Sequence, residues 1–139
     1  MLKLLIIRHA ESHGNATGDY STEMADALSE KGWQQAIALA ETLKPQTFDQ
    51  IIVSPLRRAM ETATPYLEAT DQRAELWPEL AEACWHEQRE PMADAWHPQL
   101  TALAEPFTQR FAYRDGVAVT HRQGEPFSEG LRRVHDAKQ

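Results

Sequence analysis

The chain starts with a short apolar run, residues 4–7, which ends abruptly at Arg8 and His9. The run is too short to cross a membrane, which takes about 20 apolar residues, but it suits a buried strand of a parallel sheet. In α/β proteins, ligands bind at the carboxyl ends of such strands. We therefore predict a strand over residues 3–8 that places a cation and an imidazole at this edge. That pair suits an anionic ligand and a nucleophile or general base.

The first predicted helix follows a loop at residues 10–27 that is rich in small and polar residues. The helix begins near Leu28, with Ser29 as its N-cap, and Pro45 ends it. Apolar residues recur along it at helical spacing: Trp33, Ala36, Ile37, Ala40 and Leu43. This spacing predicts a helix with one face packed against a hydrophobic core.

A second strand and a second helix follow in the same order. Residues 48–53 end in three β-branched residues, which is typical of a buried strand. Ser54 and Pro55 then suit the N-cap and the first position of a helix, and Pro65 should kink or end that helix. The alternation predicts a three-layer α/β/α domain with a mostly parallel sheet, in which residues 3–8 and 48–53 are neighbouring strands.

The second half of the sequence is less regular, and we expect it to belong to the same single domain, residues 1–139. Residues 70–115 contain several tryptophans and prolines but no clear period. This favours an insertion of short helices and loops that covers the functional edge of the sheet. Residues 116–120 suit a short strand or an extended loop, and residues 128–139 suit a helix.

Charge and composition exclude some partners. The net charge of −7 argues against a nucleic-acid partner, because a phosphate backbone requires a basic protein face. A small phosphorylated substrate needs only a local basic pocket, so the net charge does not exclude it. The sequence has no long apolar run and no clear signal peptide, so we expect a cytoplasmic protein without a membrane partner. Cys84 is the single cysteine, which excludes an intrachain disulfide. The sequence leaves a homo-oligomer open.

Five segments, in this order, resemble the motifs of the histidine phosphatase superfamily, also called the phosphoglycerate mutase-like family. The first three carry most of the resemblance. The segments are Leu5-Ile6-Ile7-Arg8-His9-Ala10-Glu11-Ser12 with Asn15, Ala27-Leu28-Ser29-Glu30-Lys31-Gly32-Trp33-Gln34-Gln35-Ala36, Ser54-Pro55-Leu56-Arg57-Arg58-Ala59-Met60-Glu61-Thr62-Ala63, Leu80-Ala81-Glu82, and Gly124-Glu125 with Glu129 and Arg133.

The resemblance implies a phosphoglycerate mutase-like fold and hydrolysis of a phosphomonoester through a phosphohistidine. His9 would be the nucleophile, and Glu82 would donate a proton to the leaving oxygen. Arg8, Arg58 and Asn15 would bind the phosphate. The residue types suit these roles, because a neutral imidazole attacks phosphorus and a planar guanidinium matches phosphate oxygens. Arginines supply the positive charge, so we expect no metal and no other cofactor.

Several alternatives stay open. Within the family they are phosphoglycerate mutase-type phosphoryl transfer and an inactive relative that serves as an interaction or anion-binding module. Mutases usually have longer insertions, so this short chain favours a phosphatase. Outside the family, His9, Glu11 and His13 are candidate metal ligands, although their spacing differs from that of zinc proteases. A cysteine phosphatase using Cys84 fails on spacing, because its loop needs an arginine where Glu90 stands.

The family resemblance also implies a second catalytic histidine, in a Val-x-x-His-Gly pattern after the Gly124-Glu125 segment. The chain reaches Gln139 without a His-Gly dipeptide, and Arg122 follows His121 where glycine would be required. We therefore expect a domain that is truncated before this motif and incomplete at its C-terminus. On that expectation, the 139 residues alone are weakly active or inactive.

Overall fold

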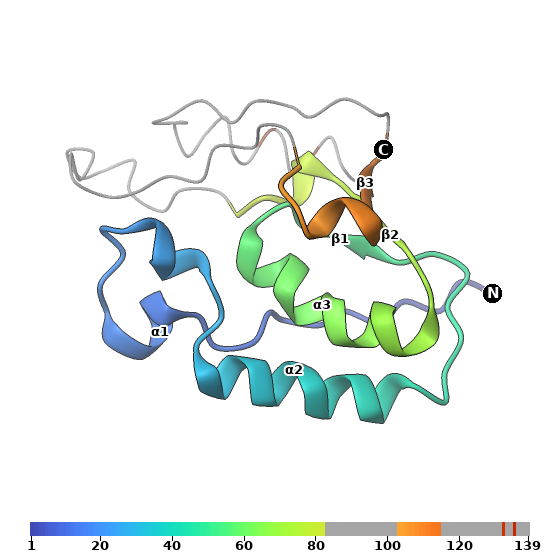
Figure 1. The fold of residues 1–139 in the computed structure, drawn as a ribbon. Helices are drawn as coiled ribbons and strands as arrows, with labels where there is room; N and C mark the ends of the chain where they lie inside the picture. Colours follow the sequence, from blue (N-terminus) through green and yellow to red (C-terminus); the bar gives the residue numbers. More distant parts are fainter. Residues whose placement is uncertain (83–102, 115–131, 133–134, 136–139) are drawn as a thin grey trace.

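A computed structural model describes residues 1–82, 103–114, 132 and 135 (Figure 1). Three strands form a parallel sheet in the order β1-β2-β3. They are β1 (Ile52–Val53), β2 (Ala74–Leu76) and β3 (Phe111–Tyr113). In the register, Val53 pairs with Leu76, and Leu76 pairs with Tyr113. A parallel sheet combined with helices confirms the predicted α/β class.

Two long helices, α2 (Glu30–Leu43) and α3 (Arg57–Thr70), pack against each other (Figure 1). A short helix, α1 (His13–Thr17), follows the N-terminal segment. Three helical turns among the described residues up to position 114 are of the 3-10 type: η1 (Glu23–Asp26), η2 (Pro78–Leu80) and η3 (Phe107–Gln109).

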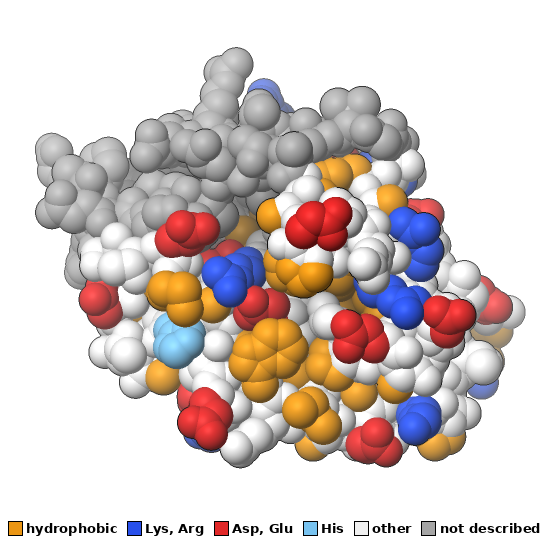
Figure 2. All heavy atoms as spheres, in the orientation of Figure 1, with side chains coloured by type: hydrophobic (Ala, Val, Ile, Leu, Met, Phe, Trp, Pro, Cys, Tyr) orange, Lys and Arg blue, Asp and Glu red, His pale blue; other side chains and the backbone are white. Residues whose placement is uncertain are grey.

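Helix α2 confirms the prediction made from its cap and apolar spacing. The Ser29 hydroxyl accepts the Gly32 N–H at 3.0 Å, and the helix ends at Leu43, before Pro45. The core-facing residues differ in part from the prediction, because Trp33 and Ile37 are exposed. These two residues lie four positions apart on one flank of the stripe. Figure 2 shows hydrophobic side chains among charged ones on this face of the molecule.

Helix α3 begins later than predicted, with Leu56 as its N-cap in place of Ser54. Leu56 keeps an extended backbone, and its buried side chain packs with Ala81. Of the two effects expected of Pro65, the end of the helix is wrong, since the helix runs through the proline to Thr70, and the kink stays a prediction. The residues that follow the proline, Tyr66 and Leu67, are buried in the core, and their burial offsets the lost backbone hydrogen bond.

Residues 3–8 do not form the predicted strand. They carry no strand assignment, and β1 pairs with β2 instead. Their apolar side chains are exposed in the described part of the molecule. The physical reason is that an apolar run gains from burial but becomes a strand only when a neighbouring backbone completes its hydrogen bonds.

Residues 70–115 contribute strands β2 and β3 to the sheet, where the sequence predicted only short helices and loops. Residues 83–102 lie outside the described residues, so covering of the functional edge by this segment stays a prediction. The predicted element at residues 116–120 lies outside them as well. Of residues 128–139, only Arg132 and His135 are described, both with helical backbone.

The main core lies between the sheet and the two long helices. It joins Leu43 of α2, Val53 of β1, Leu67 of α3, Leu76 of β2 and Phe111 of β3. A smaller cluster of Ala10, Leu28 and Ala36 packs the loop after His9 against the start of α2. This second cluster fixes the loop next to helix α2.

Candidate functional site

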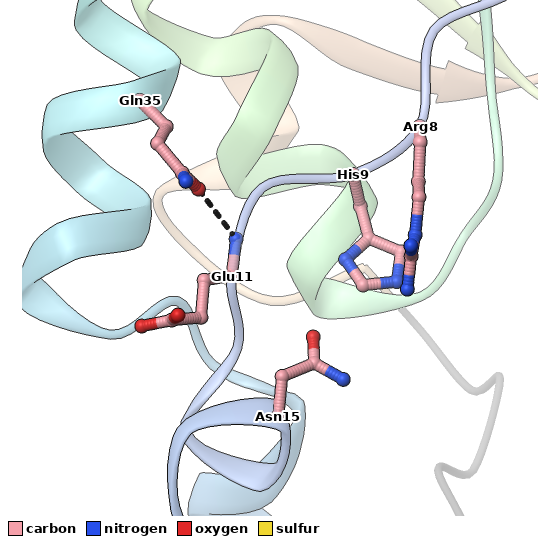
Figure 3. A pocket seen from close by; sticks show the side chains of 5 residues that line it. All are labelled: Arg8, His9, Glu11, Asn15 and Gln35. Atoms are coloured by element: carbon pink, nitrogen blue, oxygen red, sulfur yellow. Dashed lines mark hydrogen bonds between the residues drawn. The ribbon is translucent and has the colours of Figure 1, made fainter.

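The backbone immediately after His9 is held by one side chain from each long helix. The Ala10 N–H donates to the Thr62 hydroxyl of α3 at 2.9 Å. The Glu11 N–H donates to Gln35 Oε1 of α2, also at 2.9 Å (Figure 3). The backbone that follows His9 is therefore anchored to both long helices, whereas residues 3–8 before it have no strand partner among the described residues.

The next residues cap α1. The Ser12 hydroxyl accepts the Asn15 N–H, and Asn15 Oδ1 accepts the Ser12 N–H, both at 3.1 Å. This reciprocal pair is a capping box built on Ser12, which is almost fully buried. The amide nitrogen of Asn15 also donates to the Tyr20 hydroxyl at 3.3 Å. Asn15 thus has a structural role beside its predicted phosphate-binding role.

A polar cavity of about 290 Å³ lies at this point. It is lined by Arg8, His9, Glu11, Asn15 and Gln35. Figure 3 shows the side chains of Arg8 and His9 next to each other, with the Asn15 amide below them. The structure therefore brings three of the predicted site residues together in one cavity.

The ring of His9 is oriented by its own backbone neighbour. His9 Nδ1 lies 2.7 Å from the Ala10 carbonyl oxygen. Because a carbonyl oxygen only accepts, this contact assigns the proton of the neutral ring to Nδ1. The other nitrogen, Nε2, then carries the lone pair that a nucleophile needs.

The other two predicted residues, Arg58 and Glu82, contact each other. Arg58 Nη2 donates to Glu82 Oε2 at 2.5 Å, and Arg58 Nη1 donates to Asp26 Oδ1 at 2.5 Å. The Asp26 side chain is only 4% exposed, whereas that of Glu82 is 54% exposed. Burial raises the pKa of Asp26, while the Arg58 guanidinium and the backbone N–H groups of Arg57 and Arg58 oppose this rise.

Thr62 links the two groups of residues. Its hydroxyl accepts the Ala10 N–H and donates to the Arg58 carbonyl at 2.6 Å. The loop that holds His9 and the first turn of α3 that holds Arg58 are therefore joined by a single buried side chain.

Four other glutamates lie close to Glu82 in the sequence, and the two that the structure describes have other partners. Glu79 pairs with Arg114 at 2.9 Å, and Glu75 accepts a hydrogen bond from Gln50 at 3.2 Å. Glu87 and Glu90 lie outside the described residues. Glu82 is thus the candidate that contacts Arg58, and its chemical role stays a prediction.

Four residues that contact or support the site were not among the predicted site residues: Glu11, Asp26, Gln35 and Thr62. Glu11, Gln35 and Thr62 fall inside the motif segments, so the sequence held a signal for them. Asp26 directly precedes a motif segment, and its partner Arg58 is 32 positions away, so nothing local indicated its contact.

The described residues contain no cluster of three or more His, Cys, Asp or Glu side chains that could hold a metal ion. His9, Glu11 and His13 do not form such a group. None of the helices in the described ranges is long and apolar enough to cross a membrane.

Three curated relatives have names that describe phosphoryl chemistry. An adenosylcobalamin/alpha-ribazole phosphatase from Salmonella typhi is 38% identical over 81 residues, 58% of this chain and 40% of the relative. Phosphoserine phosphatase 1 from Hydrogenobacter thermophilus is 44% identical over 69 residues, 50% of this chain and 33% of the relative. A 2,3-bisphosphoglycerate-dependent phosphoglycerate mutase from Streptococcus sanguinis is 45% identical over 80 residues, 55% of this chain and 33% of the relative.

The matches thus span well under half of the length of these relatives. A family model extends further along the chain. The model described as "Histidine phosphatase superfamily (branch 1)" matches residues 4–139. This range includes every residue of the cavity and both partners of Arg58. The chain therefore belongs to the histidine phosphatase superfamily.

Proposed function

We propose that this chain acts as a phosphatase that hydrolyses a small phosphomonoester through a phosphohistidine on His9. The observation that carries the proposal is the shared cavity of Arg8, His9 and Asn15. The contact of His9 Nδ1 with the Ala10 carbonyl supports it, because that contact leaves Nε2 available for attack. The names of the phosphatase relatives point to the same reaction class.

In the proposed mechanism, His9 Nε2 attacks the phosphorus of the bound phosphate. A P–N bond forms while the P–O bond to the leaving group breaks, and Glu82 gives a proton to that leaving oxygen. Water then gives a proton to the Glu82 carboxylate as its oxygen attacks the phosphohistidine. The P–N bond breaks, which releases inorganic phosphate and restores the neutral imidazole and the protonated Glu82. Arg8 and Arg58 stabilise the charge that develops on the phosphoryl oxygens, as fixed cationic donors do in such sites.

Phosphoryl transfer of the mutase type is the second candidate, because a relative with that name matches at 45% identity. A mutase must retain its phosphorylated intermediate and return the phosphoryl group to it. Turnover of 2- or 3-phosphoglycerate by isomerisation faster than by hydrolysis would favour this candidate over the phosphatase.

The test combines turnover with trapping of the intermediate. The purified full-length protein that contains this chain is incubated with ³²P-labelled phosphomonoester and quenched in alkali, in which a phosphohistidine is stable. We expect label on the wild-type protein and none on His9→Ala, together with a loss of turnover by several orders of magnitude in that variant. His13→Ala is the matched control, since His13 lies four positions further on in α1, and it should keep both signals.

Two outcomes contradict the proposal. Turnover that survives His9→Ala would exclude His9 as the nucleophile. Binding of phosphate by the full-length wild-type protein with no turnover of any phosphomonoester would identify it as an anion-binding relative.

A further inference from the structure

We propose that Asp26 is a positioning residue that holds Arg58 in place for phosphate, and that phosphate displaces Glu82 from the same guanidinium. The inference rests on the proposed function, in which Arg58 binds the substrate phosphate. It concerns a residue with no assigned role and the order in which partners occupy Arg58.

Asp26 is a fixed partner of Arg58 because both of its carboxylate oxygens are engaged. Oδ1 accepts from Arg58 Nη1, and Oδ2 accepts the backbone N–H of Arg57 at 2.9 Å. The second bond satisfies a free donor in the first turn of α3, where the N-cap Leu56 makes no side-chain cap. Asp26 therefore binds the Arg58 side chain and the backbone of α3, the helix that contains Arg58, at the same time.

A second buried carboxylate, that of Glu61 in α3, contacts the residues that follow η1. Glu61 of α3 accepts the Leu28 N–H at 2.6 Å and the Arg57 Nε–H at 2.7 Å. Asp26 thus reaches from η1 to α3, while Glu61 reaches from α3 to the residue two positions after η1. The side chains of Asp26 and Glu61 are 4% and 6% exposed, so little water competes for these bonds. The frame around Arg58 is consequently rigid on the Asp26 side.

Glu82 differs from Asp26 in its environment. Its side chain is more than half exposed, and ion pairs at exposed positions contribute little stability because water and salt screen them. Two carboxylates beside one guanidinium also carry a net negative charge, which repels a phosphate dianion. Phosphate can pair with Arg58 most favourably when one carboxylate leaves, and the exposed Glu82 is the one that can move. We therefore expect Arg58 to keep Asp26 and to exchange Glu82 for phosphate.

The two acidic residues should then affect phosphate binding in opposite directions. Asp26→Asn removes a negative charge, which by electrostatics alone would tighten phosphate binding, but it also removes the anchor of Arg58. If positioning dominates, the Kd for inorganic phosphate rises, by on the order of 10-fold for the loss of a charged hydrogen bond. Glu82→Gln removes the competing charge while Asp26 stays in place, so the Kd should fall severalfold.

The experiment measures binding of inorganic phosphate by calorimetry to the full chain at neutral pH. The variants are Asp26→Asn, Glu82→Gln and Arg58→Gln, with Asp26→Asn also made in the Arg58→Gln background. Glu68→Gln on the exposed surface of α3 is the charge-matched control and should leave the Kd unchanged. Because Asp26 acts through Arg58, Asp26→Asn should have no further effect once Arg58 is replaced. A general loss of stability would not disappear in that background.

Each outcome decides a separate point. Wild-type binding that is unchanged or tighter in Asp26→Asn overturns the positioning role and leaves the proposed function intact. Weaker or unchanged binding in Glu82→Gln overturns the exchange. A wild-type chain that neither binds phosphate nor hydrolyses a phosphomonoester overturns the proposed function and this inference together.

Asp26 is buried, so Asp26→Asn needs a check of folding by circular dichroism. If that variant is unfolded, the ¹⁵N spectrum of the arginine side chains in the wild-type chain decides the question. Hindered rotation of the Arg58 guanidinium both before and after phosphate addition supports the fixed contact with Asp26. Free rotation in either state contradicts it.

Discussion

At the scale of single residues, the hydroxyl of Thr62 connects the loop that holds His9 to the turn that holds Arg58. Valine has a similar shape but no hydroxyl, so Thr62→Val leaves the Ala10 N–H without its acceptor. We expect the free energy of unfolding to fall by about 1–3 kcal/mol, the cost of a buried unsatisfied donor. Turnover should fall by on the order of 10-fold or more, because the backbone next to His9 loses an anchor. Urea unfolding and hydrolysis of p-nitrophenyl phosphate measure the two effects.

The matched control for this prediction is Thr64→Val on the same helix. The Thr64 hydroxyl donates to the Met60 carbonyl of α3, at 2.8 Å, and so lies within its own helix. Its removal should change stability and turnover little. Equal turnover in Thr62→Val and Thr64→Val would show that the link to Ala10 does not position His9.

Glu11 makes the stability of the folded chain depend on pH. The hydrogen bond from the Ser29 hydroxyl, followed by that from Lys31, lowers the pKa of Glu11 below its ordinary value of 4.5. A carboxyl group whose pKa is lowered by folding stabilises the protein above the unfolded-state pKa, and this contribution is lost as the pH falls through the folded-state pKa. Glu11→Gln should therefore be less stable than the wild type at neutral pH, and the difference should shrink below about pH 4.5.

Urea unfolding of both proteins, in steps from neutral pH down to about pH 3, checks the sign of this effect. Glu41→Gln, at an exposed position of α2, is the control. A stability difference between Glu11→Gln and the wild type that grows as the pH falls would contradict the prediction.

At the scale of elements, helix α2 and the loop at Glu11 approach each other too closely for any side chain at Gly32. A Cβ atom at this position would lie 2.0 Å from the Glu11 carbonyl oxygen. Gly32→Ala must therefore push the two backbones apart, which should cost about 1–3 kcal/mol or more and lengthen the Glu11–Gln35 hydrogen bond. The midpoint temperature of thermal unfolding and the rate of turnover should both decrease.

Gly18→Ala serves as the comparison for this substitution. Gly18 has a positive φ of 75°, and a Cβ there would meet no atom within 4 Å. Its replacement should cost only the backbone strain, about 1 kcal/mol, and leave turnover near the wild-type level. If Gly32→Ala were no more destabilising than Gly18→Ala, the close contact would not limit the packing of α2.

The elements that could be predicted from the sequence are those specified by nearby residues. Helix α2 has its own N-cap and apolar stripe, and Arg8, His9 and Asn15 lie within one motif. The strand expected at residues 3–8 depends on a partner that is distant in sequence, and three-residue β2 has no period to detect. Helix α3 continues through Pro65 because the burial of the neighbouring residues outweighs the tendency of proline to end a helix.

The site residues that the sequence did not predict also depend on contacts between segments that are distant in sequence. Thr62 holds Ala10 across 52 positions and Gln35 holds Glu11 across 24. Asp26 accepts a backbone N–H in the first turn of α3 from another element, while the hydroxyl of Ser54, the predicted N-cap, accepts the Leu56 N–H at 3.4 Å. Sequence motifs identify the residue types of such a site, but the hydrogen bonds that position them depend on the packing of α2 and α3.

At the scale of the whole molecule, the N-terminal run is the most unusual surface of the described chain. Leu4 and Ile6 are 76% and 83% exposed, while Leu5 and Ile7 between and after them are less exposed. This alternation is that of an extended strand, although the run has no strand partner among the described residues. Exposed apolar side chains on an extended backbone that has no strand partner among the described residues favour association with another chain.

We therefore expect the 139-residue chain to associate as its concentration rises and to bind the dye ANS, which reports exposed apolar surface. The double variant Leu4→Glu and Ile6→Glu places charges on the more exposed side of the run and should weaken both signals. Ile37→Glu, an exposed apolar position on α2, is the control and should behave like the wild type. Light scattering over a range of concentrations measures the mass. A wild-type chain that stays monomeric and binds no ANS would mean that residues 2–7 are covered in solution, and so would locate the missing strand partner within the same chain.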